Sequence, residues 1–298
     1  MGKFFFGAKR AAAFAGALAA VVLLALAAWS FFVEPNLLTV TRVEIPVAAW
    51  AGTDKGARVV VLSDFHLAPG EAEEKRLARI VEETLASSPD AVFLLGDYVK
   101  GTRREGMMGA EKIAAGLRPL AERVPVFACF GNHDGFYGNA ALSQAFRSAG
   151  IVLMRKGVQA LRVRGNADFL VVVTLDPDSF GPVPGILPKF PDEVPAGTVR
   201  TMLSHSPDVF PLLAEKNLCD VAFCGHTHGG QICLPCGVPV VTSSRVVGRA
   251  FAYGRKAIPG GGELFVTRGL GTSIVPLRLF CPPEILVVDF VPGRESPE

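Results

Sequence analysis

The feature that most constrains the fold of this chain is a set of polar motifs that directly follow short apolar runs. The runs are Arg58–Leu62, Ala91–Leu95, Val124–Phe130, Thr201–Leu203 and Asp220–Phe223, and they have the length and composition of buried strands. The motifs supply, in chain order, Asp64 with His66, Asp97, Asn132 with His133 and Asp134, His205, and His226 with His228. Because the carboxyl ends of parallel strands meet at one edge of a sheet, we expect these side chains to lie together.

The histidine pair in Phe223–Gly230 leaves two interpretations open when it is taken alone. A Gly-His-x-His segment at the end of a strand is typical of a functional loop, but two surface or core histidines explain it equally well. The whole histidine inventory favours the first interpretation, since the chain has five histidines and all of them lie in the strand-ending motifs.

The segments between the apolar runs predict an alternation of strands and helices. Amphipathic patterns indicate helices over Glu71–Ala86, Ala110–Leu120 and Asn139–Ala149. This order favours parallel strands joined by right-handed crossovers. The predicted strands Ile151–Val163 and Phe169–Thr174 follow one another with little helix between them. From this point the predicted fold class shifts from α/β towards α+β. We therefore expect one mixed α/β (α+β) domain over residues 38–298.

The N-terminus predicts a membrane span within residues 1–37. Ala11–Val33 contains no charged residue and measures about 34 Å as a helix, enough for a hydrocarbon core of about 30 Å. Lys3, Lys9 and Arg10 precede the stretch, and Trp29, Phe31 and Phe32 end it. The positive-inside rule then predicts a single-pass protein of the inner (cytoplasmic) membrane with its domain on the extracytoplasmic side. A cleaved signal peptide is the alternative.

Composition excludes some classes of partner. Half of the residues are hydrophobic and the formal net charge is +2, with no basic stripe, so we expect no nucleic acid as a partner. The six cysteines are too few for a disulfide scaffold of this size. Cys233 and Cys236 have C-x-x-C spacing without a second pair, which leaves a local disulfide or two packed thiols as alternatives.

The segment Asp176–Gly197 is rich in proline and glycine and predicts a long loop. A loop of this length is a candidate rim that faces the substrate or the membrane, although a surface loop without a functional role explains it equally well.

The strand-ending motifs together predict metal chemistry. They combine carboxylate, imidazole and amide ligands in numbers that suit two divalent ions. A carboxylate such as Asp97 can bridge two ions, and such a pair activates water and holds the oxygens of a phosphoryl group. Hydrolysis of a phosphate ester or a pyrophosphate is the reaction we expect.

The order Asp-x-His, Gly-Asp, Gly-Asn-His-Asp, His and Gly-His-x-His resembles the calcineurin-like metallophosphoesterase family from Arg58 onward. The N-terminal anchor, Gly225–Gln231, Arg268–Gly271 and Cys281–Ile285 resemble its membrane-associated bacterial branch of YkuE/YaeI-type phosphodiesterases. The resemblance implies a four-layer αββα sandwich of two mixed sheets flanked by helices.

The resemblance also implies a role for each motif residue. Asp64, His66 and His228 are implied to hold one metal ion, and Asn132, His205 and His226 the other, with Asp97 bridging the two. His133 is implied to face the scissile phosphate as an acid or a charge stabiliser, and Asp134 to orient it. The mixed ligands are compatible with Mn²⁺, Fe²⁺, Zn²⁺ or Ni²⁺.

The leading hypothesis is therefore a membrane-anchored, two-metal phosphodiesterase or pyrophosphatase that uses a metal-bridging hydroxide. A narrower alternative is a lipid-linked substrate of the UDP-2,3-diacylglucosamine type, as in lipid A synthesis. A cytoplasmic nucleotide sugar conflicts with the predicted orientation. An alternative of another class is a non-catalytic metal-binding module at the membrane.

Overall fold

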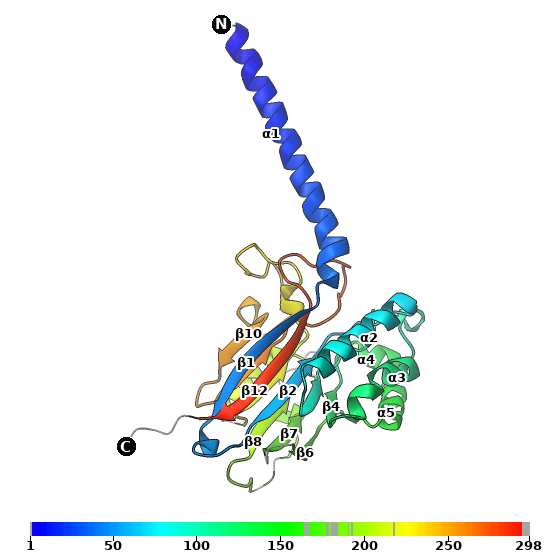
Figure 1. Ribbon diagram of the computed structural model, residues 1–298, viewed down its shortest axis with the longest axis vertical. Coiled ribbons are helices and arrows are strands. Elements are labelled where there is room, and N and C mark those ends of the chain that lie inside the picture. The colour runs from blue at the N-terminus through cyan, green and yellow to red at the C-terminus, as the bar shows by residue number, and fades with distance from the viewer. Residues whose placement is uncertain are drawn as a thin grey trace, which may run out of the picture.

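The fold is described from a computed structural model, in which residues 2–163, 167–176, 179, 184–189, 191, 193–216 and 218–293 are placed. Helix α1 (Gly2–Ala28) continues through a π-helical turn (Trp29–Val33) and a 3₁₀ turn (Glu34–Asn36). It projects from one end of the domain (Figure 1). The stretch Ala12–Asn36 is long and apolar enough to cross a membrane by length and composition.

Two six-stranded sheets form the centre of the domain. The first sheet has the order β1 (Thr39–Val47), β12 (Glu284–Pro292), β2 (Ala57–Leu62), β3 (Ala91–Leu94), β4 (Val126–Cys129), β5 (Val152–Met154). The second has the order β10 (Gly254–Ala257), β11 (Glu263–Val266), β9 (Val221–Cys224), β8 (Val199–Leu203), β7 (Asp168–Val173), β6 (Gly157–Arg162). Both sheets are mixed, because β12 runs antiparallel to β2, and β10 and β6 run antiparallel to their neighbours.

The two sheets pack face to face and helices cover their outer faces (Figure 1). In β2, Val59 and Val61 pack between the sheets, whereas Val60 and Leu62 pack under the helices, as the two-residue period of a strand requires. The helices on the first sheet are α2 (Glu71–Ala86), α3 (Ala110–Ala121) and α5 (Asn139–Ser148). Helix α7 (Phe210–Lys216) packs on the second sheet. The predicted four-layer αββα fold class is confirmed.

The segment Ile151–Val163, predicted as one strand, forms two strands that belong to different sheets. β5 pairs with β4 in the first sheet, and β6 pairs with β7 in the second. The chain leaves one sheet for the other at Arg155 and Lys156. The prediction of a single strand included the polar residues Arg155 and Lys156, and these are the residues that mark the crossing in the sequence.

Candidate metal centre

The strand-ending motifs meet at one edge of the two sheets, and their backbone is unusual there. Asp64 (φ 55°), His66 (44°), Asp97 (54°), His226 (69°) and His228 (52°) all lie in the left-handed region. Residues other than glycine adopt this region rarely, and clusters of such residues mark sites where the surrounding fold imposes a conformation. The turns after β2, β3 and β9 therefore direct these side chains toward one place.

Glycines next to these residues allow the turns to approach one another closely. A Cβ atom on Gly131 would lie 2.2 Å from Asp97 Oδ1, and one on Gly225 would lie 1.9 Å from Ser63 Oγ. Any larger residue at either position would displace the candidate ligands, so the glycines of the Gly-Asn-His-Asp and Gly-His-x-His motifs are required by packing.

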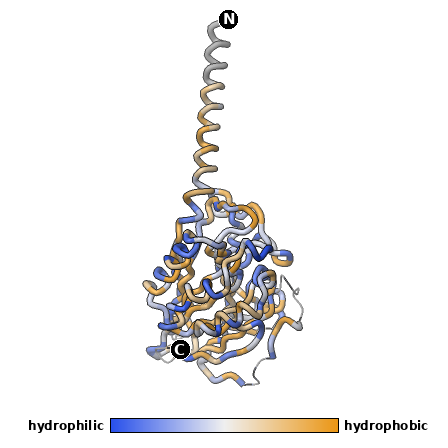
Figure 2. Tube along the Cα trace, turned by 90° about the vertical axis from the view of Figure 1, so that its right-hand side faces the viewer, coloured by the Kyte–Doolittle hydropathy of each residue, from blue (hydrophilic) through white to orange (hydrophobic). Residues whose placement is uncertain are grey.

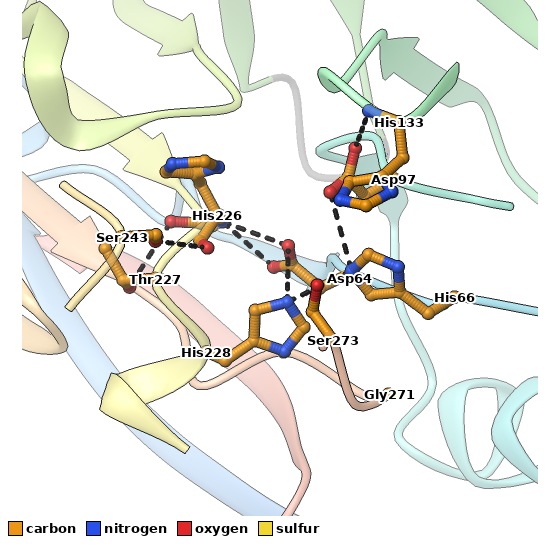
Figure 3. Close-up of polar contacts among 12 residues, drawn as sticks. Asp64, His66, Asp97, His133, His226, Thr227, His228, Ser243, Gly271 and Ser273 are labelled. Atoms are coloured by element: carbon orange, nitrogen blue, oxygen red, sulfur yellow. Dashed lines mark hydrogen bonds and ion pairs between the residues drawn. The ribbon is translucent and has the colours of Figure 1, made fainter. Parts of the chain in front are cut away.

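One group of candidate ligands comprises Asp64, His66 and His228 (Figure 3). The Nε2 atoms of His66 and His228 are 3.0 Å apart, and His228 Nε2 lies 3.5 Å from Asp64 Oδ1. Both histidines are buried. Burial lowers the pKa of His66 to about 3 and that of His228 to about 4, so both imidazoles are neutral at pH 7, the form that binds a metal.

A second group lies beside the first and comprises Asn132, His205 and His226. Asn132 Oδ1 is 3.0 Å from His205 Nε2 and 3.1 Å from His226 Nδ1, and the two imidazole nitrogens are 3.3 Å apart. Asp97 lies between the groups, with Oδ2 at 3.4 Å from both His66 Nε2 and His205 Nε2. This is the position that a bridging carboxylate needs.

The atoms in this cluster fit divalent cations. His205 Nδ1 lies 2.7 Å from the carbonyl oxygen of Leu95, to which it donates, so Nε2 is the ring nitrogen left to face the cluster. Nε2 lies close to two oxygen acceptors, Asn132 Oδ1 and Asp97 Oδ2. Burial disfavours a charge on His205, but the Asp97 carboxylate outweighs it and raises the pKa of His205. The surroundings therefore favour positive charge at this point, as a bound cation provides.

His133 lies at the edge of this cluster, above His66 and Asp97. Its backbone N–H donates to Asp97 Oδ1 (2.8 Å), and its Nδ1 lies 2.7 Å from the carbonyl oxygen of Gly101. The ring packs edge-on against His66, with the ring centroids 4.8 Å apart. With Nδ1 bound to Gly101, Nε2 is the ring nitrogen left for a substrate or a metal ion.

The implied contact between Asp134 and the His133 ring is wrong. The buried Asp134 carboxylate accepts hydrogen bonds from the backbone N–H groups of Asp97 (2.9 Å), Tyr98 (2.9 Å) and Gly131 (2.8 Å). Asp134 is the first residue of the short helix α4 (Asp134–Tyr137), so its side chain turns back toward the end of β3. It holds the Asp97 and Gly131 turns together, while the carbonyl of Gly101 takes the orienting role for His133.

A cavity of about 360 Å³ opens over the cluster. Asp97, Asn132, His133, His226 and His228 form its polar floor. Apolar side chains of two loops form its walls, namely Ile232, Val241, Ile274 and Val275. Of the proline-rich segment Asp176–Gly197, the described residues do not line this cavity, and the remainder lies outside the described residues.

Sequence reasoning missed Arg278, which supports the loop behind His228. Its side chain is fully buried and donates to the carbonyl oxygens of Arg268 (2.8 Å), Gly271 (2.6 Å) and Cys281 (2.9 Å). A signal was present in the sequence, because Arg278 is the one charged residue between Gly269 and Pro283. A lone cation in an apolar run of this kind indicates a buried and bonded guanidinium.

The C-x-x-C pair is neither a disulfide nor two packed thiols. All six cysteines lie among the described residues and all are free. Cys236 is exposed, whereas Cys233 is buried with its thiol near the carbonyl of Gly229 (3.3 Å). The thiol of Cys281 lies against the neighbouring carbonyl of His228 (3.3 Å). The two-residue spacing therefore reflects a turn between Cys233 and Cys236.

Carboxylates, imidazoles and an amide gathered at the strand ends of a two-sheet sandwich define a metal-dependent hydrolase. Comparison with known proteins agrees, since residues 57–230 match the model of the calcineurin-like phosphoesterase family. The chain belongs to this family and is a metal-dependent phosphoric ester hydrolase.

Several curated relatives cover most of the chain. It is 31% identical to phosphodiesterase YaeI of Escherichia coli over 78% of this chain and 82% of the relative. It is 28% identical to the metallophosphoesterase YkuE of Bacillus subtilis, over 91% of this chain and 93% of the relative. It is also 28% identical to the UDP-2,3-diacylglucosamine pyrophosphatase LpxG of Chlamydia trachomatis, over 87% and 91%.

Proposed function

We propose that this protein is a membrane-anchored phosphodiesterase with two divalent metal ions in the cluster at the strand ends. The observation that carries the proposal is the position of the Asp97 carboxylate, at 3.4 Å from one imidazole of each ligand group. Asp64, His66 and His228 would hold one ion, Asn132, His205 and His226 the other, and Asp97 would bridge them. The nitrogen and oxygen donors suit Mn²⁺, Fe²⁺, Zn²⁺ or Ni²⁺.

Two bound divalent ions would supply an activated water and neutralise the charge on the phosphoryl oxygens. The chain itself provides the remaining parts. His133 lies beside the cluster at the cavity floor, where its Nε2 is placed to give a proton to the leaving oxygen or to stabilise negative charge. Gly101 and Asp97 fix the position of this residue through its ring and its backbone N–H.

Replacing His133 by asparagine is expected to lower kcat for bis-p-nitrophenyl phosphate by roughly 10²- to 10³-fold, because a side chain placed to stabilise the developing negative charge is lost from the cavity. Metal content, measured by mass spectrometry of the purified protein, should stay at the wild-type level. His228→Asn serves as the matched control and should lose metal as well as activity. Loss of metal in the His133 variant would instead make His133 a ligand.

A phosphodiester is the proposed substrate class, and a pyrophosphate is the second candidate. The relative LpxG, whose name describes a pyrophosphatase acting on a lipid-linked substrate, favours the second candidate. The family assignment does not support the alternative of a non-catalytic metal-binding module.

We also propose that residues 1–37 form the cytoplasmic tip and the membrane anchor, and residues 38–298 the catalytic domain outside the cytoplasm. The apolar stretch Ala12–Asn36 and the basic residues before it support this placement. A cysteine at the exposed position 54, introduced as Asp54→Cys in a Cys236→Ser background, should be labelled by an impermeant thiol reagent added to intact cells, because the other cysteines are buried. Labelling only after lysis would place the domain in the cytoplasm.

The central test uses the full chain in detergent, stripped of metal and then reloaded with Mn²⁺. We expect hydrolysis of bis-p-nitrophenyl phosphate to appear only after reloading, with close to two ions bound per chain. Two bound ions without turnover would redirect the proposal to pyrophosphates, tested with a fluorescent nucleotide sugar. A protein that binds no metal under these conditions contradicts the proposal.

A further inference from the structure

Two loops at the anchor end of the domain expose a group of apolar side chains. One loop follows β9 and the other joins β11 to β12. We call the group the apolar rim, and it consists of Leu234, Val238, Val240, Val241, Ile274 and Phe280. Their exposed fractions run from 40% for Phe280 to complete exposure for Ile274. The two loops adjoin, since the backbone N–H of Cys233 donates to the carbonyl oxygen of Leu279 (2.8 Å), and exposed apolar side chains on adjoining loops indicate an interaction surface.

The loops of the apolar rim are tied to the base of α1. The backbone N–H of Arg278 donates to the carbonyl oxygen of Ser30 (2.9 Å), and Ser30 lies inside the apolar stretch Ala12–Asn36. The buried Glu34 carboxylate accepts from the backbone N–H of Cys281 and from Trp29 Nε1 (2.9 Å). These contacts place the β11–β12 loop level with the last turns of the proposed membrane span.

The figures agree with this placement. Figure 1 shows both loops at the end of the domain from which α1 projects. Figure 2 shows apolar stretches of the chain at the same end. Arg245 and Arg249 are exposed on the β9 loop, where cations suit the anionic headgroups of a lipid surface.

Two residues of the apolar rim also line the metal cavity. Val241 and Ile274 belong to the rim and line the cavity, whose floor carries Asp97 and His133. A surface that covered the rim would therefore also cover the entrance to the proposed catalytic centre.

We propose that the apolar rim is a membrane-docking surface, which lies on the same bilayer that α1 spans and opens the metal cavity at the level of the lipid headgroups. The occupant of the surface is the bilayer, because Ser30 and Arg278 hold the rim loop beside the membrane span. Partial insertion of the rim removes its apolar side chains from water, as in other proteins that bind at the membrane interface. The inference rests on the proposed anchoring of α1.

The test uses the full chain in nanodiscs of phosphatidylcholine and phosphatidylglycerol, with an environment-sensitive fluorophore on Cys236. This cysteine is exposed on the turn between Leu234 and Val238, and the other cysteines are buried. Nitroxide lipids labelled near the headgroup should quench this probe at least about twofold more than a probe at the control position Asp54→Cys in a Cys236→Ser background. Residue 54 is exposed beyond the far end of β1, a strand about 30 Å long.

The double variant Leu234→Glu with Val238→Glu should reduce quenching at Cys236 to the level of the control position. Val152→Glu, an exposed apolar position on β5, should leave the quenching unchanged. Far-UV circular dichroism checks that each variant is folded. Equal quenching at Cys236 and at position 54 overturns the docking proposal, and so does a shielded Cys236 probe whose signal depends on protein concentration, since a second copy would then cover the rim.

Failure of the anchor gives a different result from failure of docking. A chain that does not co-elute with nanodiscs contradicts the anchoring of α1, whatever the probe shows. If the chain co-elutes with nanodiscs but Cys236 is not quenched, the result supports the anchoring of α1 and contradicts the docking surface. Neither readout depends on catalytic activity.

Discussion

Asp97→Asn is expected to lower kcat/KM for bis-p-nitrophenyl phosphate on the order of 10³-fold and to reduce bound metal below two ions per chain. The Asp97 carboxylate is 2% exposed, and its Oδ2 lies 3.4 Å from His66 Nε2 and from His205 Nε2. The surrounding imidazoles lower its pKa against the effect of burial, so the wild-type side chain is ionised at neutral pH. Asparagine keeps the shape and removes the negative charge that both ions would share.

The measurement pairs metal analysis by mass spectrometry with steady-state kinetics on Mn²⁺-loaded protein. Asp54→Asn, at an exposed position outside the strands, is the matched control and should behave as wild type. An Asp97→Asn protein that retains two ions and full activity would remove the bridging role. Loss of activity with both ions retained would mean that Asp97 serves only to position His133. The backbone N–H of His133 donates a hydrogen bond to Asp97.

Arg278→Met is expected to destabilise the domain by about 3 kcal/mol or more, since buried carbonyl groups lose their donors and each costs about 1–3 kcal/mol when left unpaired. The guanidinium donates to the carbonyl oxygens of Arg268, Gly269, Gly271 and Cys281. Methionine fills a similar volume but donates no hydrogen bond. The apparent Tm in a thermal scan should fall by roughly 6–12 °C.

Arg162→Met is the control for this experiment. The Arg162 side chain is 69% exposed and its ion pair with Asp168 is 3.4 Å long, so we expect a change within about 0.5 kcal/mol. Metal content of the Arg278 variant should also fall, because its loop packs behind His228. Equal Tm values for the two variants would show that the carbonyl groups find other partners.

The sequence pattern located residues that the structure brings together at the strand ends, and the family resemblance supplied the fold class. Asp64, His66, Asp97, His205 and His226 were identifiable because each follows a buried strand, and parallel strands bring such positions to one edge. The resemblance to a known family, and not the periodicity, supplied the two sheets. Arg155 and Lys156 interrupt the apolar run within Ile151–Val163, but such an interruption does not show that β5 and β6 belong to different sheets.

Contacts between side chains and distant backbone were harder to predict. Asp134 follows His133 in the chain, and the short helix α4 turns its carboxylate away to the amides of Asp97 and Tyr98. Cys233 and Cys236 are close in sequence, yet Cys233 lies against Gly229 while Cys236 faces solvent. Such contacts depend on the direction of a few turns, which no local pattern records.

The pairing of β1 with β12 has a consequence for how the protein is made. Residues 39–47 leave the ribosome directly after helix α1, but their partner strand spans residues 284–292. At about 5–20 residues per second, the intervening chain takes on the order of tens of seconds to synthesise. During that interval β1 has an unpaired edge, which is a site for wrong association. The first strand to emerge is therefore among the last to be paired, and a truncated chain that lacks β12 would carry α1 and β1 without a complete first sheet.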